Sequence, residues 1–406
     1  MLRLLVEGWR FCPNSFSVLN QYQLVELMKR RDVALFHRDV PYDAKWWKWE
    51  RGLLPPDQEA AIEGLKDLPA GERADVCLRI SHPYRISRSP DADRTFVFGT
   101  AELGIIEDLK IPRPGGEGGG GSAREALATR DASFLTCSKW SAHGFVRTGA
   151  APDNVAMVHL GFDPNAFKPP TFVQRDALRK KFGWEGKFVF LNVSTLSWYK
   201  GIHPLLFGFG LIAQKFPNTL LAIKGADSLY RMDDRLDGVL NAMPTGLRAL
   251  VKERIRYVGK TLSHAEVAEM YQAGDCYLTP YHGEGFNLPV LEAAACGMPT
   301  IATAGGPTDE FTTPDFLLPI KATTMTNPDL ERSHGPGAIA FRVDGDHLVA
   351  QMERAIQDDS FRTRAFIAGP DFVRARFTWK HTVDKMLDAF TATNRASCPA
   401  FNWKGA

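Results

Sequence analysis

One stretch of the sequence, residues 276–310, constrains this chain more than any other part. It consists of an apolar run, a glycine-bearing loop, a small-residue segment and a second apolar run, which predicts strand, loop, helix and strand. Asn287 is a suitable N-cap for this helix, and Pro289 is tolerated in its first turn because an amide there would lack an intrahelical partner. Gly297 and Pro299 end the helix. Its start therefore faces the loop that follows the first strand.

The start of this helix is an expected ligand site. Backbone amides and the positive end of the helix dipole suit it to an anion. Gly283 and Gly285 let the backbone approach a ligand closely. Glu292 lies in the first turn and leans back toward the helix start, so it and the loop residue Glu284 can bracket one ligand. The pattern favours a phosphate site flanked by two hydroxyl-binding carboxylates. The alternative is a buried strand-helix-strand unit whose two glutamates are merely solvated.

The segment GEGFNLPVLEAAACGMPTI, with seven residues between Glu284 and Glu292, resembles the E-x7-E signature of glycosyltransferase family 4, the group 1 family. The resemblance implies an α/β protein of the GT-B fold, with two Rossmann-like domains facing across a cleft and a C-terminal helix crossing back to the first domain. It also implies that Glu284 contacts the donor sugar as a catalytic residue and that Glu292 holds the ribose. The residues whose amides would hold the donor diphosphate are Gly285, Phe286, Asn287 and Leu288.

Length and composition agree with a two-domain globular protein. The 406 residues are 44% hydrophobic, which is enough for two cores. A formal net charge of +2 gives no reason to expect nucleic acid as a partner. The six cysteines form no CxxC pair, so we interpret them as reduced thiols of a cytoplasmic protein. We expect no signal peptide, and no apolar run approaches the roughly 20 residues of a membrane helix, so contact with the inner membrane face is at most peripheral.

The resemblance also divides the chain. It implies an N-terminal acceptor domain over 1–165, with 391–406 packing back on it, and a nucleotide-sugar donor domain over 166–390. The helical segment 372–390, which contains Trp379, is similar to the helix that crosses back to brace the first domain.

The donor domain begins with a predicted strand over 188–193, which delivers the loop 194–201 to the edge of the sheet. Lys200 and Gly201 in this loop resemble the family's KG turn, where the lysine offers a cation to the diphosphate and acts in catalysis. The arginine that the family usually carries a few residues earlier is replaced by Ser194 or Thr195, and Ser194 is assigned to the donor site.

Two further donor-side residues follow in the chain. Lys224, after the next predicted strand, either compensates in part for the missing arginine or is a solvated loop cation. Val258 ends a segment that resembles the family's base-facing strand end.

The first domain opens with an apolar strand ending at Gly8, but no GxGxxG follows it, which disfavours a dinucleotide oxidoreductase. In the family, the loop after this strand closes over donor phosphate and acceptor. Gly8 therefore becomes a donor-binding candidate, and Arg10 becomes an acceptor-side candidate.

Polar residues follow two more predicted strands, 74–80 and 95–99, and ligands of open α/β sheets gather at the carboxyl ends of strands. His82 and Glu102 are therefore candidates for catalysis and Arg85 for acceptor binding. His82 precedes a proline, so a turn residue is its alternative role. Where many family members carry a histidine, this chain has Thr100-Ala101-Glu102.

The aromatic cluster at 45–49 has two possible roles. A helix would place Trp46 and Trp49 on one face, packed on their own domain. Alternatively, the rings form an exposed platform that stacks on an acceptor sugar or rests at a membrane interface.

Neither a metal nor a cofactor is predicted. Asp91 and Asp93 form a DxD that follows a proline and no strand, which indicates a solvated turn. The glycine-rich run 112–122 lacks the lysine of a P-loop and is interpreted as a mobile loop, with Ser122 capping the next helix.

The resemblance to glycosyltransferase family 4 implies a retaining, metal-independent hexosyltransferase of polysaccharide biosynthesis. Its donor would be a UDP-, GDP- or ADP-sugar, and its acceptor a saccharide or a lipid-linked saccharide. The alternatives are a nucleotide-sugar epimerase or a phosphorylase on the same fold, and a non-catalytic protein that binds nucleotide sugars.

Overall fold

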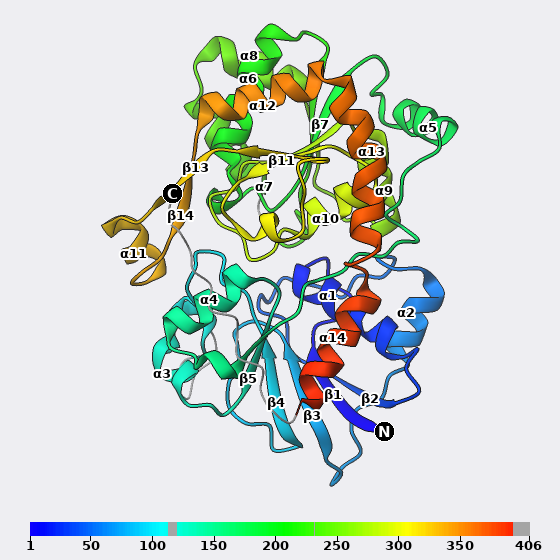
Figure 1. Cartoon of the computed structure of the whole chain (residues 1–406), viewed down its shortest axis with the longest axis vertical. Helices are drawn as coiled ribbons and strands as arrows, with labels where there is room; N and C mark the ends of the chain where they lie inside the picture. The colour runs from blue at the N-terminus through cyan, green and yellow to red at the C-terminus, as the bar shows by residue number, and fades with distance from the viewer. Residues whose placement is uncertain (113–119, 231, 393–406) are drawn as a thin grey trace. The chain divides into compact units, whose positions relative to one another are not determined.

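Two units build the protein, each with its own sheet and core. The structure, a computed structural model, describes residues 1–112, 120–230 and 232–392. Of these, 1–161, 326–339 and 379–392 form the first unit, and 162–325 and 340–378 form the second. The two sheets are parallel, and helices accompany both, as the α/β prediction requires (Figure 1).

The first unit contains a parallel sheet with strand order β2-β1-β3-β4-β5-β6. In β1, Leu4 pairs with Val76 of β3, which brings the carboxyl ends of the two strands to the same edge. The strands are β1 (Leu2–Gly8), β2 (Val33–Asp39), β3 (Ala74–Ile80), β4 (Ala92–Phe98), β5 (Ser133–Thr136) and β6 (Val155–Met157).

The helices of the first unit include one that the chain supplies from its C-terminal part. This helix, α14, lies beside α1 (Figure 1), where Trp379 stacks on Tyr22 at 5.3 Å. The helices are α1 (Ser15–Leu27), α2 (Pro56–Glu63), α3 (Ala123–Ala128), α4 (Lys139–Thr148), α11 (Pro328–His334) and α14 (Trp379–Thr391), with 3-10 turns η1 (Asp108–Lys110) and η2 (Pro152–Asn154).

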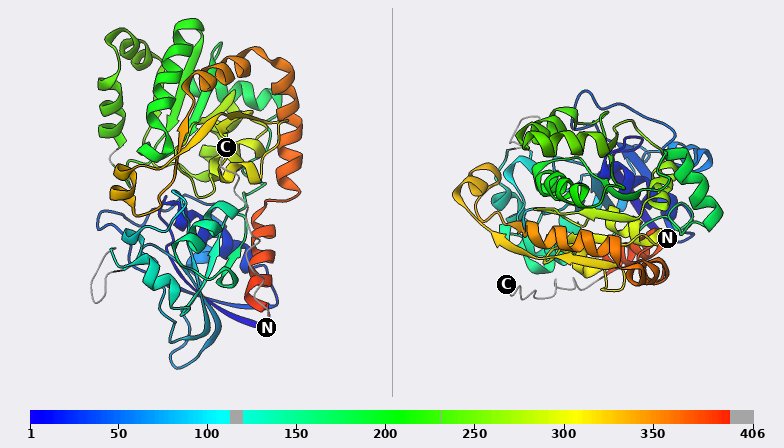
Figure 2. Two further views of the ribbon diagram at one scale, coloured as in Figure 1. Left: turned by 60° about the vertical axis from the view of Figure 1, so that its left-hand side comes forward. Right: turned by 90° about the horizontal axis from the view of Figure 1, so that it is seen from above.

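The second unit contains a parallel sheet with order β12-β11-β10-β7-β8-β9 and a separate antiparallel pair, β13-β14. Helices lie on both faces of the larger sheet (Figure 2). The strands are β7 (Phe188–Val193), β8 (Thr219–Lys224), β9 (Ile255–Val258), β10 (Cys276–Thr279), β11 (Thr300–Thr303), β12 (Leu317–Ile320), β13 (Ala322–Met325) and β14 (Ala340–Val343).

Helix α6 shows how this unit builds its core. Its buried Leu205, Leu206, Phe209 and Ile212 recur at the spacing of one helical face and pack in one cluster with Phe190 of β7. The helices of the unit are α5 (Phe172–Phe182), α6 (Ile202–Lys215), α7 (Met232–Ala242), α8 (Thr245–Arg254), α9 (His264–Ala273), α10 (Leu288–Ala295), α12 (Gly345–Gln357) and α13 (Asp359–Arg374), with 3-10 turns η3 (Trp198–Lys200) and η4 (Pro307–Glu310).

The division of the chain differs from the predicted one in three places. The change of unit falls at 161/162 and not at 165/166, and both 326–339 and 379–390 belong to the first unit. Within that unit, His334 pairs with Glu107 at 2.6 Å and the Ile339 amide donates to the Leu103 carbonyl at 2.8 Å. These contacts tie the segment 326–339 to the first unit, whereas the prediction assigned it to the donor domain.

The predicted crossing helix over 372–390 is two helices, since α13 ends at Arg374 and α14 begins at Trp379. Most of the predicted packing segment 391–406 lies outside the described residues, as does most of the glycine-rich run 112–122. Ser122 caps α3 as predicted, because its side chain accepts from the Glu125 amide. In the described part of the chain, no helix is long and apolar enough to cross a membrane.

The predicted helix over 45–49 is wrong, because residues 40–55 contain neither helix nor strand. Tertiary contacts decide the backbone here: Trp47 turns inward and packs edge-on against Trp9, with ring centres 5.4 Å apart. Trp46 stays 66% exposed, which contradicts the packed alternative for that ring.

Candidate active site

The predicted donor site lies in the second unit, at the carboxyl ends of neighbouring strands β7 and β10. Glu284, in the loop after β10, is buried with 5% of its surface exposed. Asn287 occupies the N-cap of α10 in a left-handed conformation, but its side chain makes no capping bond there. It donates instead to the Thr279 hydroxyl at 3.2 Å, which corrects the predicted capping bond. The side chain thus ties the loop to β10 and leaves the first amides of α10 without a side-chain cap.

The loop after β7 meets the loop after β10 through an ion pair and two backbone bonds. Lys200 Nζ lies 2.7 Å from Glu284 Oε1. The Tyr199 carbonyl accepts from the amides of His282 and Gly283 at 2.8 and 3.0 Å. Two of the predicted charged residues of the donor site, Lys200 and Glu284, are therefore in contact.

Gly201 allows this close approach of the two loops. Its φ of +74° is a left-handed conformation, and a Cβ at this position would lie 1.9 Å from the Pro280 carbonyl oxygen. Any side chain at this position would push the loops apart. Steric crowding therefore explains why the predicted KG turn has a glycine here.

Glu292, the predicted ribose ligand, is half-buried in α10 and accepts a hydrogen bond from the Tyr271 hydroxyl at 3.0 Å. Burial raises the pKa of Glu292 to about 7, and the bond from Tyr271 opposes this rise. Burial, reinforced by the neighbouring Glu292 carboxylate, also raises the pKa of Tyr271 well above its usual range. The carboxyl group of Glu292 is therefore poised to titrate near neutral pH.

The amides of Gly285 to Leu288 are the predicted diphosphate ligands, and one side chain among them is committed to packing. Phe286 is 3% exposed and stacks on Phe311 with ring centres 4.5 Å apart. Its backbone is consequently the part that can serve a ligand.

The other predicted donor residues make local contacts at the same edge. Ser194 donates to Asn192 Oδ1 at 2.7 Å. Lys224 is buried, and its ammonium donates to the Gly225 carbonyl. The Val258 carbonyl accepts from the Gly225 amide at 3.0 Å. No described group of three or more His, Cys, Asp or Glu is arranged to hold a metal ion.

The candidates at the start of the first unit are tightly packed. A Cβ on Gly8 would lie 2.8 Å from Asn20 Nδ2 and 3.0 Å from the Ile80 carbonyl oxygen. Arg10 is 5% exposed and binds Asp39 through two bonds of 2.9 and 2.5 Å. Gly8 and Arg10 therefore have structural roles, whatever they contribute to a ligand.

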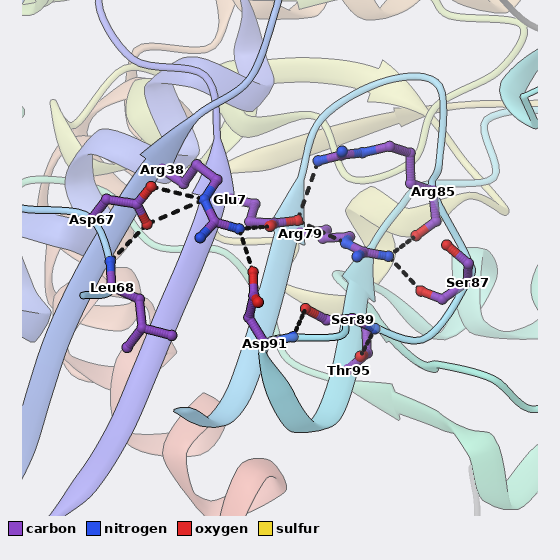
Figure 3. A network of polar contacts seen from close by, with 10 residues as sticks. All are labelled: Glu7, Arg38, Asp67, Leu68, Arg79, Arg85, Ser87, Ser89, Asp91 and Thr95. Carbon is purple, nitrogen blue, oxygen red and sulfur yellow. Dashed lines mark hydrogen bonds and ion pairs between the residues drawn. The ribbon is translucent and has the colours of Figure 1, made fainter. Parts of the chain in front are cut away.

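Arg85 belongs to a charge network on the first sheet (Figure 3). The network is centred on buried Glu7, which pairs with Arg38 at 3.0 Å, Arg79 at 2.9 Å and Arg85 at 3.2 Å. Arg79 also donates to the Arg85 and Ser87 carbonyls, so the network holds the loop that follows β3. The predicted solvated aspartates are ion-paired: Asp91 with Arg38 and Asp93 with Arg73.

His82 and Glu102 differ in their surroundings. His82 lies 3.2 Å from Asp43, with 22% of its side chain exposed. Glu102 pairs with buried Lys110 and accepts from the Thr100 hydroxyl at 2.7 Å. Burial acts to raise the pKa of Glu102, but Lys110 and Thr100 hold it at about 2. Glu102 is thus a carboxylate at any physiological pH.

Residues 174–365 match the sequence profile of the family described as "Glycosyl transferases group 1". This segment, nearly half of the chain, thus resembles the group 1 glycosyltransferases. The matched segment contains Lys200, Glu284 and Glu292, so the glycosyltransferase signature and the donor-site geometry coincide.

Two curated glycosyltransferase relatives match parts of the chain. A mannosylfructose-phosphate synthase from Agrobacterium fabrum is 29% identical over 161 residues, covering 39% of this chain and 34% of the relative. A D-inositol 3-phosphate glycosyltransferase from Catenulispora acidiphila is 26% identical over 303 residues, covering 71% and 64%. The chain thus spans between one third and two thirds of the length of these relatives.

A solved structure supports the glycosyltransferase fold of the whole chain. HepE from Anabaena, crystallised with UDP-glucose, superposes with a TM-score of 0.65 at 15% identity, covering 96% of this chain and all of HepE. Together with the two parallel sheets, this likeness establishes the predicted GT-B fold.

Sequence reasoning missed Tyr271 as a partner of Glu292. It lies in α9, 21 positions before the carboxylate that it contacts. In the sequence, Tyr271 is the one aromatic residue of the segment 265–273, and no local spacing links it to Glu292.

Proposed function

We propose that this glycosyltransferase moves a sugar from a nucleotide-diphosphate sugar to a saccharide or a lipid-linked saccharide. The observation that carries the proposal is the junction of Lys200, Glu284 and the start of α10 at one edge of a parallel sheet. Such an edge is where open α/β sheets bind ligands, and a helix start suits a phosphate. The UDP-glucose held by the structurally similar HepE supports a nucleotide sugar as donor.

Each donor-site residue has a proposed task. The amides of Gly285 to Leu288 hold the diphosphate, and Glu284 accepts bonds from the sugar hydroxyls. Glu292 accepts from the ribose hydroxyls, held in place by Tyr271. The backbone near Val258 faces the base. Ser194 and Lys224 complete the site from the loops after β7 and β8.

The reaction is proposed to retain the configuration of the anomeric carbon. Negative charge grows on the leaving diphosphate, where fixed amides and the Lys200 ammonium meet it without reorganisation. The acceptor hydroxyl attacks from the same face and loses its proton to the departing phosphate oxygen. This route assigns charge stabilisation to the protein's own groups and uses no metal ion and no protein nucleophile.

The acceptor is proposed to bind the first unit. Trp46 is the most exposed of the candidates there, and His82 is proposed to orient the acceptor hydroxyl. Arg10, Arg85 and Glu102 are proposed to shape this side through the contacts described above, whereas Gly8 remains a proposed donor-binding residue. Any contact with a membrane would be peripheral and would involve the same exposed ring.

A reducing, cytoplasmic location is part of the proposal. The cysteines that the structure describes are all buried free thiols, as a reducing compartment allows.

The direct test measures donor binding and transfer. Thermal-shift screening with UDP-, GDP- and ADP-sugars should show stabilisation by one nucleotide class, followed by transfer to saccharide acceptors with an unchanged anomeric configuration by NMR. Lack of stabilisation by any nucleotide sugar would overturn the proposal. Interconversion of donor sugars without an acceptor would indicate an epimerase, dependence on inorganic phosphate a phosphorylase, and binding without turnover a non-catalytic protein.

A further inference from the structure

Few positively charged side chains at the proposed donor site are available to a ligand. Lys200 is paired with Glu284, so the two charges cancel. After β8, the buried Lys224 ammonium donates to the Gly225 carbonyl, and Asp227 in the same loop accepts from Tyr257. A nucleoside diphosphate carries at least two negative charges into this edge of the sheet. Lys200 and Lys224 are therefore both engaged by partners within the protein.

A guanidinium reaches this edge from α7. Arg235 Nη1 donates to the Thr195 carbonyl at 2.8 Å, and its guanidinium lies 5.8 Å from the centre of the Tyr230 ring. Thr195 belongs to the same loop as Lys200, whose strand β7 is the neighbour of β8 in the sheet. Because α7 follows β8, its first turns lie at the carboxyl edge, where the donor would bind.

The side chain of Arg235 is exposed and is held at one end by a neutral acceptor. The acidic neighbours Asp234 and Asp237 project about 100° and about 200° around the helix from it. A guanidinium has five donors, and the bond to the Thr195 carbonyl engages one nitrogen. Planar forks of this kind bind phosphate oxygens through two parallel bonds.

We propose that Arg235 is a diphosphate-binding residue of the donor site, supplying from α7 the guanidinium that the loop 194–201 lacks. The inference rests on the proposed function and names the phosphates, not the sugar or the base, as the target. Charge on the leaving group increases during transfer, so Arg235 also favours the departure of the diphosphate.

The test compares nucleoside diphosphates with nucleosides by calorimetry. UDP, GDP and ADP are titrated into the full-length protein, and the tightest binder is compared with its nucleoside. Arg235→Ala should weaken the diphosphate roughly ten- to a hundredfold and leave the nucleoside within about twofold. The matched control Arg364→Ala removes an exposed arginine of the same unit and should change neither affinity.

A second experiment moves the positive charge from α7 to the loop 194–201. In Arg235→Ala, the further change Thr195→Arg returns a guanidinium to the loop and should recover most of the lost diphosphate affinity. Full diphosphate affinity of Arg235→Ala, an equal loss for nucleoside and diphosphate, or a double variant with wild-type melting temperature and no recovery would each overturn the inference. Failure of the wild type to bind any of the three diphosphates would instead overturn the proposed function.

Discussion

At the scale of single residues, the charge state of Glu292 determines how the proposed ribose contact depends on pH. Its pKa of about 7, raised by burial, means that the carboxyl group is protonated below neutrality. A carboxylate accepts stronger hydrogen bonds from ribose hydroxyls than a carboxylic acid does. We expect the affinity for the donor nucleotide to rise roughly three- to tenfold between pH 6 and 8. Calorimetry at both pH values measures it.

The control for this prediction is Glu292→Gln, which should abolish that part of the pH dependence while any titration of the nucleotide itself persists. A pH profile identical in wild type and variant would contradict the assignment. Glu292→Ala should weaken the nucleotide roughly ten- to a hundredfold, since a charge-assisted bond is lost.

The same raised pKa predicts a change in stability. Between the ordinary value of 4.5 and about 7, the folded protein keeps a proton that the unfolded chain releases. The free energy of unfolding contributed by Glu292 therefore falls as pH rises through this window. Glu292→Gln should raise the melting temperature more at pH 8 than at pH 5, and calorimetric scans at both pH values check this. An equal shift at both would show that the carboxyl group is not titrating there.

Lys200 should act on the transition state more than on binding. Because charge grows on the leaving diphosphate, Lys200→Ala should lower kcat by roughly a hundredfold and raise KM only slightly. Steady-state kinetics with the preferred donor separates the two. The control Lys200→Arg keeps the charge beside Glu284 and should retain more activity. A raised KM with an unchanged kcat would indicate uniform binding instead.

At the scale of elements, the contact between the loops after β7 and β10 can be tested through glycines. Gly201→Ala places a Cβ 1.9 Å from the Pro280 oxygen and strains a φ of +74°. Gly186→Ala strains a φ of +65° in open space and should cost only about 1 to 2 kcal/mol. We expect the first variant to lower the melting temperature further and to weaken nucleotide binding. Equal losses in the two variants would mean that the loops adjust freely.

The sequence predicted elements well where local pattern and tertiary packing agree. The predicted strand, helix and second strand within 276–310 appear as β10, α10 and β11. Local sequence is enough to predict apolar strands and a helix that begins beside a proline. The segment 45–49 fails because its tryptophans do not share one environment. Trp47 packs on Trp9, and Trp49 stacks on Phe11 at 4.2 Å, so contacts far along the chain override the helical spacing.

The donor-site prediction shows the same limit at finer scale. The spacing of Glu284 and Glu292 and the lysine before Gly201 are local signals, and the structure brings Lys200 and Glu284 into contact. Partners supplied by other helices, Tyr271 from α9 and Arg235 from α7, leave no periodic trace near the residues that they touch. Likewise, Arg10 looks like a loop cation in the sequence, whereas the fold buries it against Asp39.

At the scale of the whole molecule, most of the proposed donor residues belong to the second unit, and the proposed acceptor residues belong to the first. A change on the acceptor side should therefore separate transfer from donor hydrolysis. Trp46→Ala removes a ring that is 66% exposed, so the melting temperature should stay unchanged while transfer falls and donor hydrolysis persists. The control Trp47→Ala removes a ring that is 8% exposed and should cost about 3 to 5 kcal/mol of stability. Undiminished transfer by Trp46→Ala would rule out the acceptor platform.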